Sequence, residues 1–87
     1  MSEGPKVEPV TAESVLEYIT KSVVDDPDAV RIEVDDSRRR PVLNVHVAPG
    51  DMGRVIGKRG RVAGAIRTVV RAAAANDGVD VDIEFIE

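Results

Sequence analysis

The residues best suited to chemistry in this 87-residue chain lie in one short segment, Val55-Ile56-Gly57-Lys58-Arg59-Gly60. Two glycines three positions apart allow a tight turn with positive backbone φ angles, and they let a ligand approach the main chain closely. Lys58 and Arg59 would place two positive charges at the tip of that turn. Gly60 also precedes a segment with helical periodicity, and the free N–H groups at the start of a helix attract phosphate. The segment therefore predicts a site for a phosphate-bearing backbone.

The charge distribution agrees with this interpretation, although charge alone supports a solvated helix face equally well. Only together with the spacing of the glycines does it favour a phosphate site over a plain connection between two helices. The net charge is −4, but residues 52–76 contain six basic side chains and no acidic ones. Such a block creates a local positive field, which steers anions whatever the net charge. We expect Arg54, Arg61 and Arg67 to widen the basic edge, whereas Arg71 is expected only to solvate the outer face of its helix. Val55 and Ile56 are expected to form the floor or the core beneath bound bases.

Other chemistries find little support in the composition. The chain has no cysteine, and His46 is its only histidine. Its two aromatic residues, Tyr18 and Phe85, are too few for a platform that stacks bases. A phosphate-binding P-loop is excluded because one residue too few separates Gly53 from Gly57 for that motif. We therefore expect no catalytic residue, no metal and no cofactor, and a small nucleotide-binding enzyme is the weakest alternative.

The elements that must position the turn follow from the spacing of apolar residues. Residues 1–10 contain Pro and Gly without periodicity and predict a flexible tail, so the domain is expected to span residues 11–87. A helix is predicted over about residues 12–24, with Thr11 as its N-cap. Alternating apolar and polar residues predict three strands, at residues 30–35, 42–47 and 79–85.

Two further helices are predicted on either side of the turn. The first is short, spans residues 52–56 and begins after Asp51 as its cap; the second ends near residue 76. The inward stripe of the second is expected to consist of Val62, Ile66, Val69 and Ala73.

The order helix–strand–strand–helix–helix–strand predicts an α+β fold. The crossover through two helices makes the last two strands parallel, and the helices then cover one face of a three-stranded mixed sheet. The acidic residues of the last strand are expected on the opposite, wet face: Asp80, Asp82 and Glu84.

Taken together, these motifs resemble the KhpA family of small, stand-alone bacterial KH-domain proteins that bind RNA. The turn resembles the I-G-x-x-G signature of the KH domain. Further similar segments lie at residues 16–19, 24–28, 51–58 and 65–70. The resemblance covers nearly the whole chain, from about Thr11 to Glu87, and implies the type II KH fold.

The resemblance also implies a binding mode and partners. In KH domains about four single-stranded nucleotides are clamped in a groove. Residues 52–76 would form one wall, and the last strand with the loop of residues 36–41 would form the other. Arg38, Arg39 and Arg40 then either flank the RNA or form a solvated turn, and the two readings have equal support. The family implies no cofactor, a homodimer or a heterodimer with a KhpB-type RNA-binding protein, RNA-chaperone activity, and a link to cell shape and wall synthesis.

Two further expectations concern location and an alternative function. No apolar run approaches the roughly 20 residues of a membrane helix, and the N-terminus lacks a signal pattern, so a cytoplasmic protein is expected. The alternative to RNA binding is a protein-interaction adaptor whose KH groove is idle, which the acidic remainder of the chain would suit.

Overall fold

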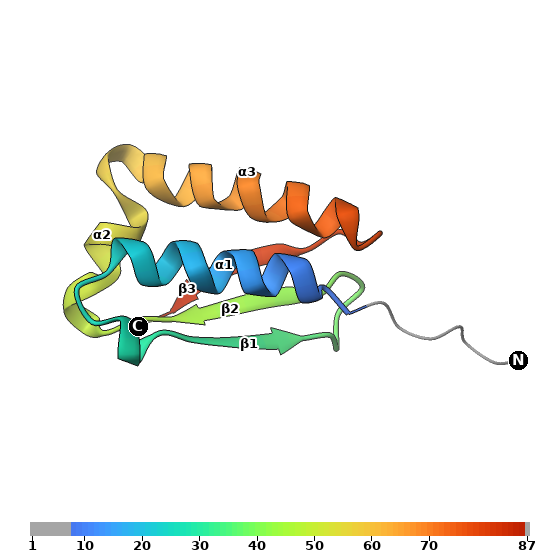
Figure 1. Ribbon diagram of the computed structural model, residues 1–87, viewed down its shortest axis with the longest axis horizontal. Coiled ribbons are helices and arrows are strands. Elements are labelled where there is room, and N and C mark those ends of the chain that lie inside the picture. Colours follow the sequence, from blue (N-terminus) through green and yellow to red (C-terminus); the bar gives the residue numbers. More distant parts are fainter. Residues whose placement is uncertain (1–7, 87) are drawn as a thin grey trace, which may run out of the picture.

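The computed structural model describes residues 8–86, and it has the α+β architecture expected from the sequence. Helices α1 (Val10–Val23) and α3 (Arg61–Asn76) lie side by side over one face of a sheet, and the short helix α2 (Met52–Ile56) stands at one end of this layer (Figure 1). The strands are β1 (Arg31–Asp35), β2 (Val42–His46) and β3 (Asp82–Ile86). The expected tail of residues 1–10 lies mostly outside the described residues, and Val10 already belongs to α1.

The sheet has the order β1-β2-β3, with β2 in the centre. β1 pairs with β2 in an antiparallel hairpin, and β2 pairs with β3 in parallel, so both connections predicted from the sequence are confirmed. The register places Leu43 of β2 opposite Val34 of β1 and Ile83 of β3. β1 and β3 are therefore both edge strands, each with one unpaired edge.

The core fills the space between the helices and the sheet. Its largest fully buried apolar side chains are Leu16, Leu43, Val45, Val55, Val70 and Val81. The predicted stripe of α3 was wrong at one position: Val69 is 47% exposed, and its neighbour Val70 is buried instead. Two adjacent valines fit the helical period almost equally well. The choice is made by tertiary packing, because α3 contacts α1 and the sheet at the same time.

The start of α1 differs from its prediction. Thr11 is not the N-cap, because the helix begins at Val10 and Pro9 occupies the cap position without a side-chain hydrogen bond. Instead, Asp77 Oδ2 accepts hydrogen bonds from the N–H groups of Thr11 (2.9 Å) and Ala12 (3.3 Å). Asp77 follows the end of α3, which runs antiparallel to α1 (Figure 1). The free donors of the first turn are thus satisfied from a residue distant in sequence.

The carboxylate of Asp51 also departs from its predicted role as a cap of α2. It makes no capping hydrogen bond to that helix. Its two oxygens accept the backbone N–H groups of Asp25 (3.1 Å) and Asp26 (3.0 Å), in the connection that follows α1. Asp51 is only 4% exposed, so this contact ties the start of α2 to the rest of the fold inside the protein.

Candidate nucleic-acid interface

The turn between α2 and α3 has the backbone that its glycines predict. Gly57 has φ 74° and ψ 175°, and Gly60 has φ 71° and ψ 16°. The Gly57 N–H donates to the carbonyl of Gly53 at 2.9 Å, which ends α2, and the Gly60 N–H donates to the carbonyl of Gly57 at 3.2 Å. A Cβ on Gly57 would overlap the side chain of Val62, lying 2.8 Å from its Cβ, whereas a Cβ on Gly60 would meet open space.

Arg59 has the same left-handed conformation as Gly60, with φ 57° and ψ 26°. For a residue with a side chain this conformation costs about 1 kcal/mol. Three of the four turn residues therefore have positive φ, and one of them carries a charge. Strained residues of this kind cluster at ligand-binding sites, so the geometry supports a functional turn. No local pattern predicts this conformation for Arg59.

The basic side chains at the turn have no polar partner among the residues that the structure describes. Lys58, Arg59 and Arg61 are exposed, and none of them forms an ion pair or a side-chain hydrogen bond within residues 8–86. No side chain caps the start of α3. Gly64, one turn into that helix, leaves the neighbouring face open, because a Cβ there would meet nothing within 4 Å. The turn thus combines three available positive charges with a helix start that has no side-chain cap.

The apolar residues expected beneath the bases divide into two groups. Val55 is fully buried, so it belongs to the core that holds α2. Ile56 is half-buried and packs against the core from its margin. Of these two residues, Ile56 alone keeps surface beside the turn that a ligand can contact.

Arg54, which the sequence predicts in the basic edge, pairs at the surface with two carboxylates of the same protein. Its Nη2 lies 2.9 Å from Asp25 Oδ2, and its Nε lies 3.6 Å from Asp51 Oδ1. Together with the hydrogen bonds of Asp51, these contacts join α2 to the connection after α1. Arg54 therefore links the helix that leads into the turn to this connection.

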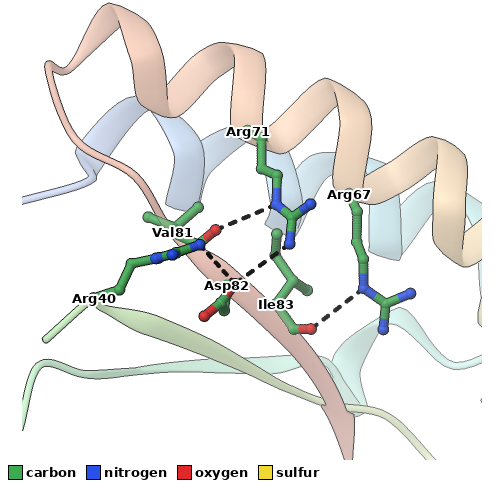
Figure 2. A network of polar contacts seen from close by, with 6 residues as sticks. All are labelled: Arg40, Arg67, Arg71, Val81, Asp82 and Ile83. Atoms are coloured by element: carbon green, nitrogen blue, oxygen red, sulfur yellow. Dashed lines mark hydrogen bonds and ion pairs between the residues drawn. The ribbon is translucent and has the colours of Figure 1, made fainter. Parts of the chain in front are cut away.

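The two arginines farther along α3 cross to the unpaired edge of β3 (Figure 2). Arg67 Nε lies 3.4 Å from the carbonyl oxygen of Ile83, and Arg71 Nε lies 3.4 Å from that of Val81. The Arg67 guanidinium also lies 5.3 Å from the ring centroid of Phe85. The expectation that Arg71 only solvates the outer face was wrong, because it binds the strand and also its Asp82 carboxylate, at 3.3 Å.

The register explains why those carbonyl groups are available. The Asp82 N–H donates to the carbonyl of Pro41, and the Val47 N–H donates to that of Ile86. Alternate residues of a strand direct their N–H and C=O groups to opposite sides. Val81, Ile83 and Phe85 therefore turn their backbone groups toward the unpaired edge, below the open face of α3.

The three arginines of the β1–β2 loop do not act together. Arg40 turns toward β3, where its Nη1 lies 3.5 Å from Asp82 Oδ1. Arg38 and Arg39 instead line a cavity of about 620 Å³ beside Val10 at the start of α1. Asp82, expected as a plain residue of the wet face, is therefore the shared partner of Arg40 and Arg71.

A second hollow, of about 340 Å³, lies between α1 and α3 and has an almost wholly apolar lining that includes Ile19, Val23 and Val69.

Within residues 8–86, no helix has the length and apolar character needed to cross a membrane. The same residues contain no cluster of three or more potential metal ligands.

Comparison with known proteins identifies similar chains. A family model described as "KhpA/KhpB, KH domain" matches residues 13–85. The RNA-binding protein KhpA of Clostridium acetobutylicum is 49% identical over 72 residues, which cover 83% of this chain and 96% of that protein. The RNA-binding protein KhpA of Streptomyces coelicolor is 48% identical over 75 residues, covering 86% and 94%. The protein of the same name from Mycobacterium tuberculosis H37Rv is 44% identical over 68 residues, covering 78% and 84%. No solved structure matched the chain.

Proposed function

The chain belongs to the KhpA/KhpB family of KH domains, and we propose on this basis that it binds single-stranded RNA and catalyses no reaction. The proposed binding unit is the KH domain of residues 11–87, and its contacts centre on the turn Gly57–Gly60. The names of the similar proteins from Clostridium and Streptomyces support RNA as the ligand. The three cations that have no polar partner within residues 8–86, beside the start of α3, carry the proposal.

The turn would bind the sugar–phosphate backbone. Gly57 and Gly60 allow a phosphate to approach the main chain. The Arg61 N–H donates to the carbonyl of Lys58, so the N–H groups that follow it in the first turn of α3 would donate to the phosphate oxygens. Lys58, Arg59 and Arg61 would add charge-assisted contacts that any sequence can satisfy. Such contacts fix the position of the strand but do not read its bases.

The unpaired edge of β3 would meet the bases. Backbone N–H and C=O groups of Ile83 and Phe85 face this edge, and they can pair with the hydrogen-bonding edges of unstacked bases. Arg67 lies over the same edge, and a guanidinium plane can stack on a base. Ile56 would supply apolar contact near the turn. Arg54 would act indirectly, by holding α2 in place.

The family resemblance supports finer proposals. One KH groove holds about four nucleotides and is expected to bind weakly. A second groove, in a homodimer or in a heterodimer with a KhpB-type protein, would raise affinity through a high effective concentration. We further propose a cytoplasmic RNA chaperone that acts in the control of cell shape and wall synthesis.

A charge reversal at the turn tests the function. The double variant Lys58→Asp with Arg59→Asp changes two exposed residues, so its melting curve should match that of the parent. Its affinity for a pool of short, random-sequence single-stranded RNA should fall at least tenfold, or about 1.4 kcal/mol.

The matched control reverses two charges elsewhere on the surface. Asp80→Lys with Glu84→Lys alters two exposed residues near or on β3 and avoids Asp82, which has arginine partners. This control should bind RNA at least as well as the parent. If the folded turn variant binds RNA as the parent does, the turn is not the binding surface and the adaptor function takes its place.

A further inference from the structure

A single carboxylate oxygen holds two arginines together at the start of β3 (Figure 2). Asp82 Oδ1 lies 3.3 Å from Arg71 Nη2 and 3.5 Å from Arg40 Nη1. The three side chains come from separate segments: the strand itself, helix α3 and the β1–β2 loop. Because two cations share one anion, the cluster keeps a net positive charge.

The contacts of this cluster can be exchanged at low cost. The side chains of Arg40, Arg71 and Asp82 are 54%, 52% and 44% exposed. Ion pairs at this exposure contribute roughly 0–1 kcal/mol each, because water competes for both partners. A phosphodiester offers the same guanidinium groups two oxygens with good geometry for paired hydrogen bonds.

Arg71 would stay in place during such an exchange. Its Nε binds the carbonyl oxygen of Val81 at 3.4 Å, separately from the Nη2 contact with Asp82. The backbone contact directs the guanidinium toward the strand edge whether or not Asp82 is its partner. The carboxylate therefore occupies a position that a phosphate oxygen could take.

The cluster lies on the path that an RNA strand would follow. Arg71 is ten residues beyond Arg61, which corresponds to about 15 Å along α3. Along this path Arg67 meets Ile83 and then Arg71 meets Val81, so the arginines track the unpaired edge of β3 away from the turn. A strand anchored at the turn and extended along that edge reaches Arg71 and Arg40.

We propose that Arg40 and Arg71 form a second phosphate site for RNA longer than about four nucleotides, and that Asp82 competes with the phosphate for it. The inference rests on the proposed function, since it extends the same binding surface. In the free protein Asp82 pairs with both arginines, and a phosphate of a longer strand would displace it from them. The exchange favours extended single strands over short fragments.

Replacement of one carboxylate tests the competition. Asp82→Asn should raise affinity several-fold for a random-sequence RNA pool of about eight nucleotides, twice the length that one KH groove clamps. The same variant should leave affinity for a tetranucleotide pool unchanged. Glu84→Gln removes the same charge from an exposed residue two positions along the strand, and it should change neither affinity.

Arg71→Ala should have the opposite effect to Asp82→Asn. It should remove the gain in affinity that the longer pool has over the tetranucleotide pool, and thermal unfolding checks that the variant is folded. The inference is overturned if Asp82→Asn and Glu84→Gln behave alike at both lengths while the parent still binds the tetranucleotide. If the parent binds neither pool, the proposed function itself is wrong.

Discussion

Two groups of cations in residues 52–76 look alike in the sequence and differ in the structure. Lys58, Arg59 and Arg61 project from the turn without a partner among the residues described. Arg54, Arg67 and Arg71 are bound to carboxylates or to backbone carbonyls of the same protein. The first group is available to a ligand without loss of an internal contact. The second group builds and braces the surface on which the ligand would lie.

The largest expected effect on stability comes from substitution of the glycines that shape the turn and present its unpartnered cations. Gly57→Ala combines a positive φ with overlap of the Val62 side chain, so it should destabilise the fold by at least about 3 kcal/mol. Gly60→Ala meets no neighbour and should cost only about 1 kcal/mol, the cost of a left-handed alanine. Urea unfolding with an unchanged m-value measures both. Equal losses for the two variants would contradict the turn geometry described here.

Substitution of Asp51 tests whether the contacts of the second group of cations, here Arg54, hold α2 in place. Asp51→Ala leaves two backbone N–H groups and Arg54 without their buried acceptor, so the free energy of unfolding should fall by about 2 kcal/mol. Asp25→Ala removes only the exposed partner of Arg54 and should change stability by less than about 0.5 kcal/mol. Urea unfolding of the two variants measures the difference. A neutral Asp51→Ala would show that α2 is held by apolar packing alone.

Asp77 gives a smaller, pH-dependent effect at the opposite end of α3. A hydrogen bond from the Thr11 side chain, helped by backbone N–H groups of Thr11 and Ala12, holds the pKa of the Asp77 carboxyl below its ordinary value despite some desolvation. A carboxyl whose pKa is lower in the folded state stabilises the fold above the unfolded-state pKa. That stabilisation is lost as pH falls through the folded-state pKa.

The variant Asp77→Asn should therefore be less stable than the parent at neutral pH and should approach it in acid. Thermal unfolding of both proteins across the acidic range measures this convergence. A stability difference that stays constant with pH would show that the carboxylate charge does not cap α1.

The sequence predicted the architecture well because each strand and helix has a clear apolar period. The hairpin, the crossover and the Gly57–Gly60 turn all follow from local patterns and from the chirality of crossovers. The resemblance of its motifs to the KhpA family then indicated the candidate nucleic-acid surface. The choice between Val69 and Val70 could not be made locally, because it depends on the angle at which α3 meets α1 and the sheet.

The partners that charged side chains find elsewhere in the fold could not be predicted from the sequence. Asp51 and Asp77 stand where helix caps are common, yet their acceptors serve backbone groups of a distant connection and a distant helix. Arg71 resembled a solvated residue because nothing local shows that it faces the edge of β3. The three consecutive arginines 38–40 look equivalent in the sequence but differ in the structure. Arg40 pairs with Asp82, whereas Arg38 and Arg39 line the cavity at the start of α1.

The salt dependence of RNA binding tests the central claim that the unpaired cations at the turn bind phosphate. If three or four phosphates are bound, log affinity for a short single strand should fall with log salt at a slope of roughly −2 to −3. The variant Lys58→Ala with Arg59→Ala should make this slope shallower by about one unit or more. Arg54→Ala should weaken binding with the slope unchanged if Arg54 acts only through the position of α2, as its pairing with Asp25 and Asp51 favours. A slope that stays at the parent value in the turn variant, or that falls equally in Arg54→Ala, would contradict the account.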